Sequence, residues 1–133
     1  MDKRFKKWEK PKVNNGELTV YNWLVQYVDG LKLGNFTDIG AFTYLNAKYG
    51  IEIEDYVQIG SHCSIYSVST IDQKKGSVIL KKNCRIGSHT TVLPNLEIGE
   101  NSIIGANSLV NKSIPSNVIA YGVPAKIIKK INE

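Results

Sequence analysis

The chain contains two histidines, His62 and His89, the side chains best suited to accept a proton near neutral pH. They stand in similar segments, IGSHCS and IGSHTT. The two cysteines, Cys63 and Cys84, form no CxxC pair and show no metal-ligand spacing. The sequence therefore offers two candidate general bases, and we expect both cysteines to be reduced core residues.

A six-residue repeat must position these side chains. One aliphatic residue recurs every six positions, with two extra residues near Tyr49 and three after Asp72. The aliphatic positions are Leu33, Ile39, Leu45, Ile53, Ile59, Ile65, Ile71, Leu80, Ile86, Val92, Ile98, Ile104 and Val110. The fifth position of each unit is mostly small, and neither an amphipathic helix nor a hairpin strand has this period.

A period of six predicts a β-helix in which three short parallel strands make one coil. Thirteen units give about four coils, with the aliphatic residue inside and glycine relieving a corner of positive φ. We expect residues 1–30 to form a basic leader and cap, and residues 31–119 to form the β-helix. We expect residues 120–133 to form a turn and a short helix. The helix is expected because apolar residues at 127, 128 and 131 would share one of its faces.

The histidines hold the fourth position of their units, which we expect to face outward. Counted along the repeat they are four units apart. Because three units make one coil, this spacing predicts that the two histidines lie on adjacent sheets, or walls, of the β-helix, about one coil apart. A thin core with flat walls favours self-association. In a trimer we therefore expect His62 of one chain and His89 of the next to line one cleft.

Composition restricts the function classes. No apolar run approaches the roughly 20 residues that span a membrane, and no apolar segment follows the basic N-terminus as a signal peptide would require. We therefore expect a cytoplasmic protein with no membrane span. The net charge is +5, and few aromatic residues accompany the basic leader, which favours a solvated segment over a nucleic-acid site. The six basic residues of this leader are Lys3, Arg4, Lys6, Lys7, Lys10 and Lys12.

The C-terminal half resembles the hexapeptide-repeat acyltransferases, and galactoside and maltose acetyltransferases in particular. The resemblance rests on IGSHTTVLPN and on IGENSIIGANSLVNKSIPSNVIAYGVPAKII. It implies a left-handed parallel β-helix, a homotrimer, acetyl-CoA as co-substrate and no metal. The coenzyme A contacts that it implies fall on Ser88, Ala106, Asn111, Lys112, Lys126 and Lys129. A solvated lysine face is the alternative interpretation of Lys126 and Lys129.

The same resemblance locates the acceptor site. Galactoside and maltose acetyltransferases carry a catalytic His in a segment similar to IYTATHP, and this chain reads IYSVST, with Thr70 at the His position. We expect Thr70 and Asp72 to line the acceptor site, with Asp72 orienting the base or holding an ammonium group. Asn46 stands where the galactoside enzymes have an acceptor-contacting Asn.

A second resemblance favours His62 as the base. Amino-sugar N-acetyltransferases carry a catalytic His in a unit similar to VIEHEC, five units before an LPN turn, and IGSHCS precedes VLPN by the same count. This implies His62 as general base, His89 as second candidate, and N-acetylation of a nucleotide-linked amino sugar for surface polysaccharide. O-acetylation of a glycoside or polysaccharide remains open.

Two other functional classes occur on β-helices of this kind. The γ-class carbonic anhydrases share the β-helix but use three His ligands for zinc, and this chain has only two histidines. A non-catalytic scaffold or binding module fits the repeat alone. The GVPAK tail and the interrupted repeat at residues 72–77 favour an enzyme over that scaffold.

Overall fold

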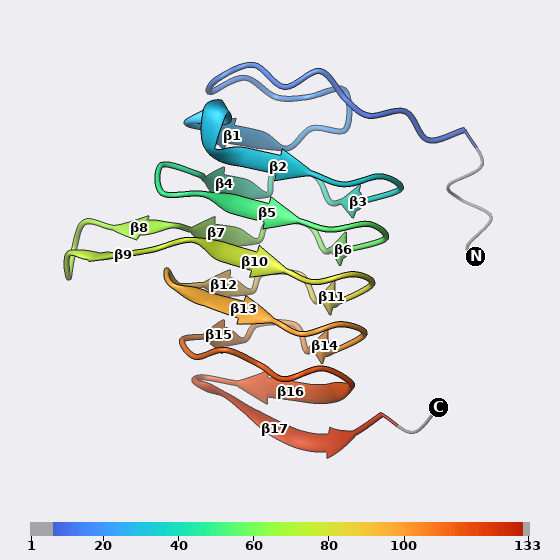
Figure 1. Ribbon diagram of the computed structural model, residues 1–133, viewed down its shortest axis with the longest axis vertical. Helices are drawn as coiled ribbons and strands as arrows, with labels where there is room; N and C mark the ends of the chain where they lie inside the picture. The colour runs from blue at the N-terminus through green and yellow to red at the C-terminus, as the bar shows by residue number, and fades with distance from the viewer. Residues whose placement is uncertain (1–6, 132–133) are drawn as a thin grey trace.

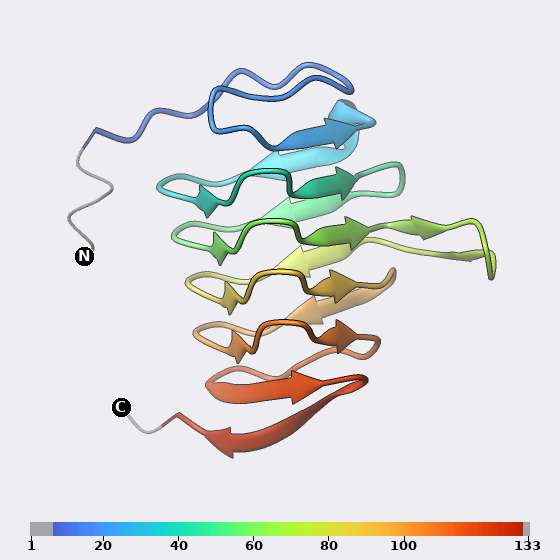
Figure 2. The same cartoon turned by 180° about the vertical axis from the view of Figure 1, so that it is seen from behind.

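The computed structural model describes residues 7–131, which form a column of stacked coils with a projecting hairpin (Figures 1 and 2). Each coil passes in turn through three parallel sheets, called here the first, second and third sheet. The first sheet contains β1 (Leu24–Gln26), β4 (Tyr44–Asn46), β7 (Ser64–Tyr66), β12 (Thr91–Val92) and β15 (Leu109–Val110). A short 3-10 turn, η2 (Val28–Gly30), follows β1.

The second sheet contains β2 (Leu31–Leu33), β5 (Ile51–Ile53), β10 (Val78–Leu80) and β13 (Leu96–Ile98). The third contains β3 (Asp38–Ile39), β6 (Gln58–Ile59), β11 (Arg85–Ile86), β14 (Ile103–Ile104), β16 (Val118–Gly122) and β17 (Ala125–Lys130). The predicted parallel β-helix is confirmed, with about five turns rather than four. The additional turn begins at β1, inside the segment that was expected to be only a leader and cap.

The core follows the repeat. Twelve of the thirteen aliphatic positions lie inside the column, where Leu33 is partly exposed and the other eleven are buried. The fifth-position residues Thr43, Cys63 and Thr90 are buried in successive coils. Ile71 is the exception, because its side chain is 98% exposed. The aliphatic positions of the repeat are therefore core positions except at the interruption, and the core also includes Trp23 and Val25, which lie in the expected leader and cap.

The interruption is a hairpin of β8 (Val68–Ser69) and β9 (Lys74–Lys75), which are antiparallel and project from the column (Figure 1). The N–H of Gly76 donates to the carbonyl of Ser67 at 2.9 Å and closes the base of the hairpin. One coil earlier the N–H of Gly50 donates to the carbonyl of Ala47 at 3.0 Å. The hairpin thus enlarges one corner while leaving the ladder on either side intact.

The glycines have a different role from the one expected. A Cβ on Gly60 or Gly87 would lie 2.5 Å from the backbone nitrogen of Ser88 or Ala106 in the next coil. Positive φ occurs instead two residues later, at His62 and His89, both with φ of 59°. Close approach between coils, and not a positive φ, therefore requires these glycines.

The predicted C-terminal helix is wrong, because residues 125–130 form strand β17, antiparallel to β16. Ile127 and Ile128 are about half exposed, so a helix would have no apolar face to bury there. The open edge of β16 supplies hydrogen-bond partners that a helix would leave unused. Pairing with β16 therefore outweighs the short helical pattern.

Candidate acyl-transfer site

The two histidines stack on each other within one chain. Their ring centroids are 4.9 Å apart and their planes differ by 5°. The prediction of adjacent walls is therefore wrong: they lie on the same corner in successive coils. The miscount arose from Ile71, which the repeat counted as a unit although it lies in the projecting hairpin between β7 and β10, the next strand of the column. The five-unit spacing from His62 to the LPN turn becomes four for the same reason.

This corner is called here the histidine edge and consists of residues 41–42, 61–62, 88–89 and 106–107. The ring of Phe42 lies 5.4 Å from that of His62, and both histidines are exposed as expected. Each corner residue donates its backbone N–H to a carbonyl one coil earlier, as from His62 to Ala41 at 3.0 Å and from His89 to Ser61 at 3.1 Å. An unbroken ladder therefore fixes this edge.

The other edge of the first sheet contains a cavity of about 380 Å³ against the hairpin, called here the hairpin cavity. Its lining residues are Tyr44, Asn46, Tyr66, Val68, Ser69, Thr70, Ile71 and Leu93. The structure thus brings Asn46 and Thr70, two of the predicted acceptor-site residues, to one cavity. Tyr44 and Tyr66 were missed, although both directly flank inward aliphatic positions and so had to face outward.

Hydrogen bonds orient Asn46. Its Nδ2 donates to the hydroxyl of Tyr44 at 3.2 Å, and its Oδ1 accepts from the backbone N–H of Lys48 at 3.2 Å. The Tyr44 hydroxyl donates in turn to Oε1 of Gln26. Burial raises the pKa of Tyr44, so its phenol stays neutral near neutral pH. Within residues 7–131, the second N–H of this amide makes no further hydrogen bond.

Asp72 does not line this cavity. A hydrogen bond with the Ser69 side chain lowers its pKa, and its Oδ1 also accepts from the N–H of Lys74 at 3.4 Å. The Lys74 ammonium lies 3.8 Å from its Oδ2. This carboxylate stabilises the turn of its own hairpin, so the structure gives no support to a role in orienting a base.

No imidazole or carboxylate occurs among the residues that line the hairpin cavity. His62 stands four residues before Tyr66, in the turn that leads into β7, and four residues span at most roughly 13 Å. Within one chain the histidine edge and the hairpin cavity therefore lie at opposite edges of the same sheet. A site that contains both would require two copies of the chain.

The predicted coenzyme A contacts fall in three places. Ser88 and Ala106 lie on the histidine edge, where the Cβ position of Gly87 abuts Ala106. Asn111 and Lys112 follow β15 and are exposed. Lys126 and Lys129 are exposed on β17, opposite Tyr121 and Ile119.

Both cysteines are free and buried, as predicted. Burial raises the pKa of Cys63, and raises that of Cys84 to about 12, so neither is poised as a thiolate. Residues 7–131 contain no cluster of three or more metal-ligating side chains. In the same range, no helix is long and apolar enough to cross a bilayer.

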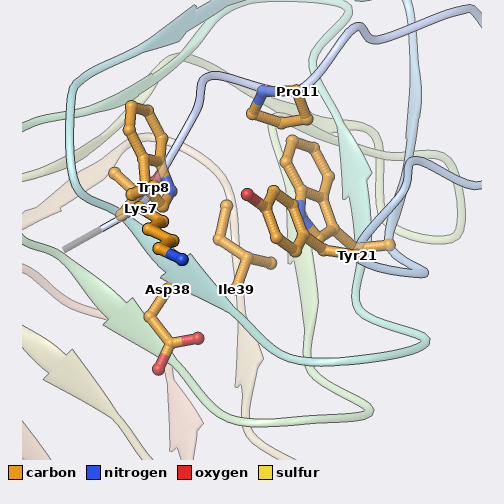
Figure 3. Close-up of a pocket in the computed structure, with 8 residues that line it drawn as sticks. Lys7, Trp8, Pro11, Tyr21, Asp38 and Ile39 are labelled. Atoms are coloured by element: carbon orange, nitrogen blue, oxygen red, sulfur yellow. The ribbon is translucent and has the colours of Figure 1, made fainter. Parts of the chain in front are cut away.

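A second cavity, of about 270 Å³, lies beneath the N-terminal segment (Figure 3). Trp8, Pro11 and Tyr21 surround it, and Lys7 and Asp38 stand at one side. It contains none of the predicted site residues.

Comparison with known proteins agrees with this geometry. Residues 77–112 match the family model described as bacterial transferase hexapeptide (six repeats). The chain carries a bacterial transferase hexapeptide domain. A hexapeptide-repeat-containing acetyltransferase from Vibrio cholerae superposes with a TM-score of 0.78 at 22% identity, covering 84% of this chain and 68% of that one. This likeness shows the left-handed β-helix fold.

Two relatives of the hexapeptide domain bear on chemistry. Galactoside O-acetyltransferase from Escherichia coli is 48% identical over 116 residues, which cover 75% of this chain and 57% of that protein. AntD, an N-acyltransferase from Bacillus cereus solved with dTDP and coenzyme A, is 26% identical with a TM-score of 0.74, covering 86% of this chain and 81% of that one. The chain thus spans little more than half the length of its galactoside relative.

Proposed function

We propose that this chain is an acetyl-CoA-dependent acetyltransferase that N-acetylates a nucleotide-linked amino sugar for surface polysaccharide synthesis. The observation that carries this proposal is the lining of the hairpin cavity, to which this chain itself contributes no imidazole or carboxylate, so that a base could come only from a neighbouring copy. A sugar hydroxyl is a poor nucleophile without a base, which typically contributes 10²–10⁴-fold. An amine that has lost one proton attacks a thioester unaided, so orientation supplies most of the acceleration.

The relatives support both halves of the reaction. AntD is named an N-acyltransferase and was solved with a nucleoside diphosphate and coenzyme A. In this chain Ser88, Ala106, Asn111, Lys112, Lys126 and Lys129 are proposed to bind acetyl-CoA. Small residues let a pantetheine arm approach the backbone, and lysines neutralise its phosphates.

The enzyme is proposed to act as a cytoplasmic homotrimer. Because the histidine edge and the hairpin cavity are at opposite edges of one sheet, a neighbouring copy would bring its histidine edge to this cavity. His62 is the proposed general base that removes the ammonium proton before attack, and His89 is the second candidate.

The test is coenzyme A release from acetyl-CoA against a panel of nucleotide-linked amino sugars and simple galactosides. The proposal expects turnover with at least one amino sugar and a rate at least a hundredfold lower with every galactoside. Turnover confined to galactosides would refute it.

A second candidate is O-acetylation of a glycoside, which the 48% identity to galactoside O-acetyltransferase favours. That reaction needs a base beside the acceptor hydroxyl. It therefore predicts that the variant His62→Asn abolishes transfer to galactosides.

A further inference from the structure

Two lysines neighbour residues that line the hairpin cavity, because Lys48 follows Asn46 by two positions and Lys75 pairs with Val68. The ammonium of Lys48 lies 5.7 Å from the ring centroid of Tyr49, and that of Lys75 lies 5.5 Å from the same ring. Lys48 is also 5.7 Å from the ring of Tyr27. Tyr49 thus gathers two cations at one place, and the group Lys48, Tyr49 and Lys75 is called here the lysine rim.

Hydrogen bonds tie the lysine rim to the cavity. The backbone N–H of Lys48 donates to Oδ1 of Asn46, which lines the cavity. The N–H of Tyr49 donates to the Ser67 hydroxyl at 2.9 Å, and that hydroxyl donates to the carbonyl of Asn46 at 2.7 Å. The lysine rim and Asn46 are therefore held as one unit.

The two lysines of β9 differ in what neutralises them. Val68 pairs with Lys75 and Ser69 with Lys74 across β8 and β9, and both Val68 and Ser69 line the cavity. Both lysines are therefore next to a wall of the cavity. The Lys74 ammonium lies 3.8 Å from Oδ2 of Asp72, whereas the Lys75 ammonium lies over the ring of Tyr49.

The charge of the lysine rim is uncompensated. Within residues 7–131, neither Lys48 nor Lys75 forms an ion pair, in contrast to Lys74 and Lys81. Two like charges brought to one ring repel each other, and a bound anion would relieve that repulsion. Lysine suits phosphate because its ammonium is a flexible point charge with three donors.

We propose that Lys48 and Lys75 bind the diphosphate of the nucleotide-linked acceptor while its sugar occupies the hairpin cavity beside Asn46 and Tyr66. The inference rests on the proposed function for the identity of the acceptor. It deepens that function, because it makes the lysine rim the feature that selects a nucleotide-linked sugar over a free one. Coenzyme A also carries a diphosphate, so the test must separate the two sources.

The experiment measures binding of dTDP and UDP by calorimetry, without an acyl donor, to the unmodified protein and to the double variant Lys48→Gln/Lys75→Gln. We expect the unmodified protein to bind at least one of these nucleotides and the double variant to bind it at least tenfold more weakly. The matched control Lys74→Gln removes the neighbouring lysine, whose charge Asp72 already neutralises, and should change binding by less than twofold. Lys48→Arg/Lys75→Arg should restore most of the affinity.

Binding of acetyl-CoA in the same variants is the second arm. Unchanged acetyl-CoA affinity in the double variant assigns the lysine rim to the acceptor. Loss of acetyl-CoA affinity would overturn the proposal by assigning the rim to coenzyme A. Absence of nucleotide binding to the unmodified protein, or an equal loss in Lys74→Gln, would also overturn it. Because no acyl transfer is measured, the result stands whether or not any amino sugar is acetylated.

Discussion

At the histidine edge of the first sheet the chain turns in the same way in four successive coils, whereas at the opposite edge the corners differ in length from coil to coil. The histidine edge repeats a glycine, a small residue and a left-handed residue, as in Gly60–His62 and Gly87–His89. At the opposite edge the corner after β4 has two residues between Ala47 and Gly50, and the next has eight between Ser67 and Gly76.

This difference indicates that the histidine edge contributes mainly to the stability of the fold and the opposite edge mainly to the shape of the cavity. Coils can stack only where the backbone approach is uniform, so the histidine edge has little freedom to vary. The hairpin is closed by one hydrogen bond at its base and therefore adds a cavity wall without disturbing its neighbours. Substitutions at the two edges should consequently act on different quantities.

The largest effect is expected from Gly87→Ala at the histidine edge. The new Cβ would lie 2.5 Å from the backbone nitrogen of Ala106, which cannot yield without shifting a coil. We expect a loss of about 3 kcal/mol or more in the free energy of unfolding, measured by urea denaturation. The control Gly50→Ala, whose Cβ would have 3.5 Å to Ser77, carries only the strain of its φ of 104° and should lose about 1 kcal/mol. Equal losses would contradict the contrast between the edges.

The next effect concerns the hairpin. Replacing residues 68–75 by Lys-Tyr, the two residues of the preceding corner, should leave the free energy of unfolding within about 1 kcal/mol of its starting value. Acetyl transfer should fall about 100-fold because one wall of the hairpin cavity disappears. Retained activity in this variant would remove the hairpin from the acceptor site.

A smaller effect is expected from His62→Asn. Turnover should fall at least tenfold with acetyl-CoA binding intact, since a positioned base would be lost. Steady-state kinetics and calorimetry measure the two quantities. The companion variant His89→Asn keeps one imidazole of the stack and should reduce turnover less. An unchanged rate in His62→Asn would exclude His62 from the mechanism.

The smallest effect is a pH dependence of stability at Cys84. Burial raises its pKa to about 12, so the fold favours the neutral thiol. The corresponding stabilisation is complete below the ordinary thiol pKa and is lost as the pH rises from there toward 12. Between pH 9 and 10 the unmodified protein should lose up to about 1.4 kcal/mol more than Cys84→Ala. Parallel pH profiles for the two proteins would show that this thiol ionises equally in both states.

The repeat predicted the core positions from Ile39 to Val110, because the large side chain that points inward from each unit is aliphatic and so marks its position in the sequence. The repeat failed at Ile71, which has the residue type and spacing of a core position but lies exposed in the hairpin. The pattern alone does not distinguish these two cases. That one residue also misplaced His62 relative to His89. The C-terminal helix failed because the strength of strand pairing depends on β16, a distant partner that a local pattern does not contain.

The sequence predicted those residues of the candidate site that match a motif. It did not predict the residues that only tertiary packing brings together. Thr70 and Asn46 were found from their segments, and the structure brings them into one cavity. The lysine rim could not be found, because Lys48 and Lys75 meet only through the ring of Tyr49 and the pairing of β8 with β9.

The central claim is that the chain transfers the acetyl group to an amine and not to a hydroxyl. The most direct test uses one nucleotide-linked amino sugar that carries both groups and determines whether the product is an amide or an ester. The product from acetyl-CoA would be isolated, treated with hydroxylamine and weighed by mass spectrometry. The account predicts a single acetyl group that survives treatment, as an amide does. An acetyl group removed by hydroxylamine would be an ester and would contradict it.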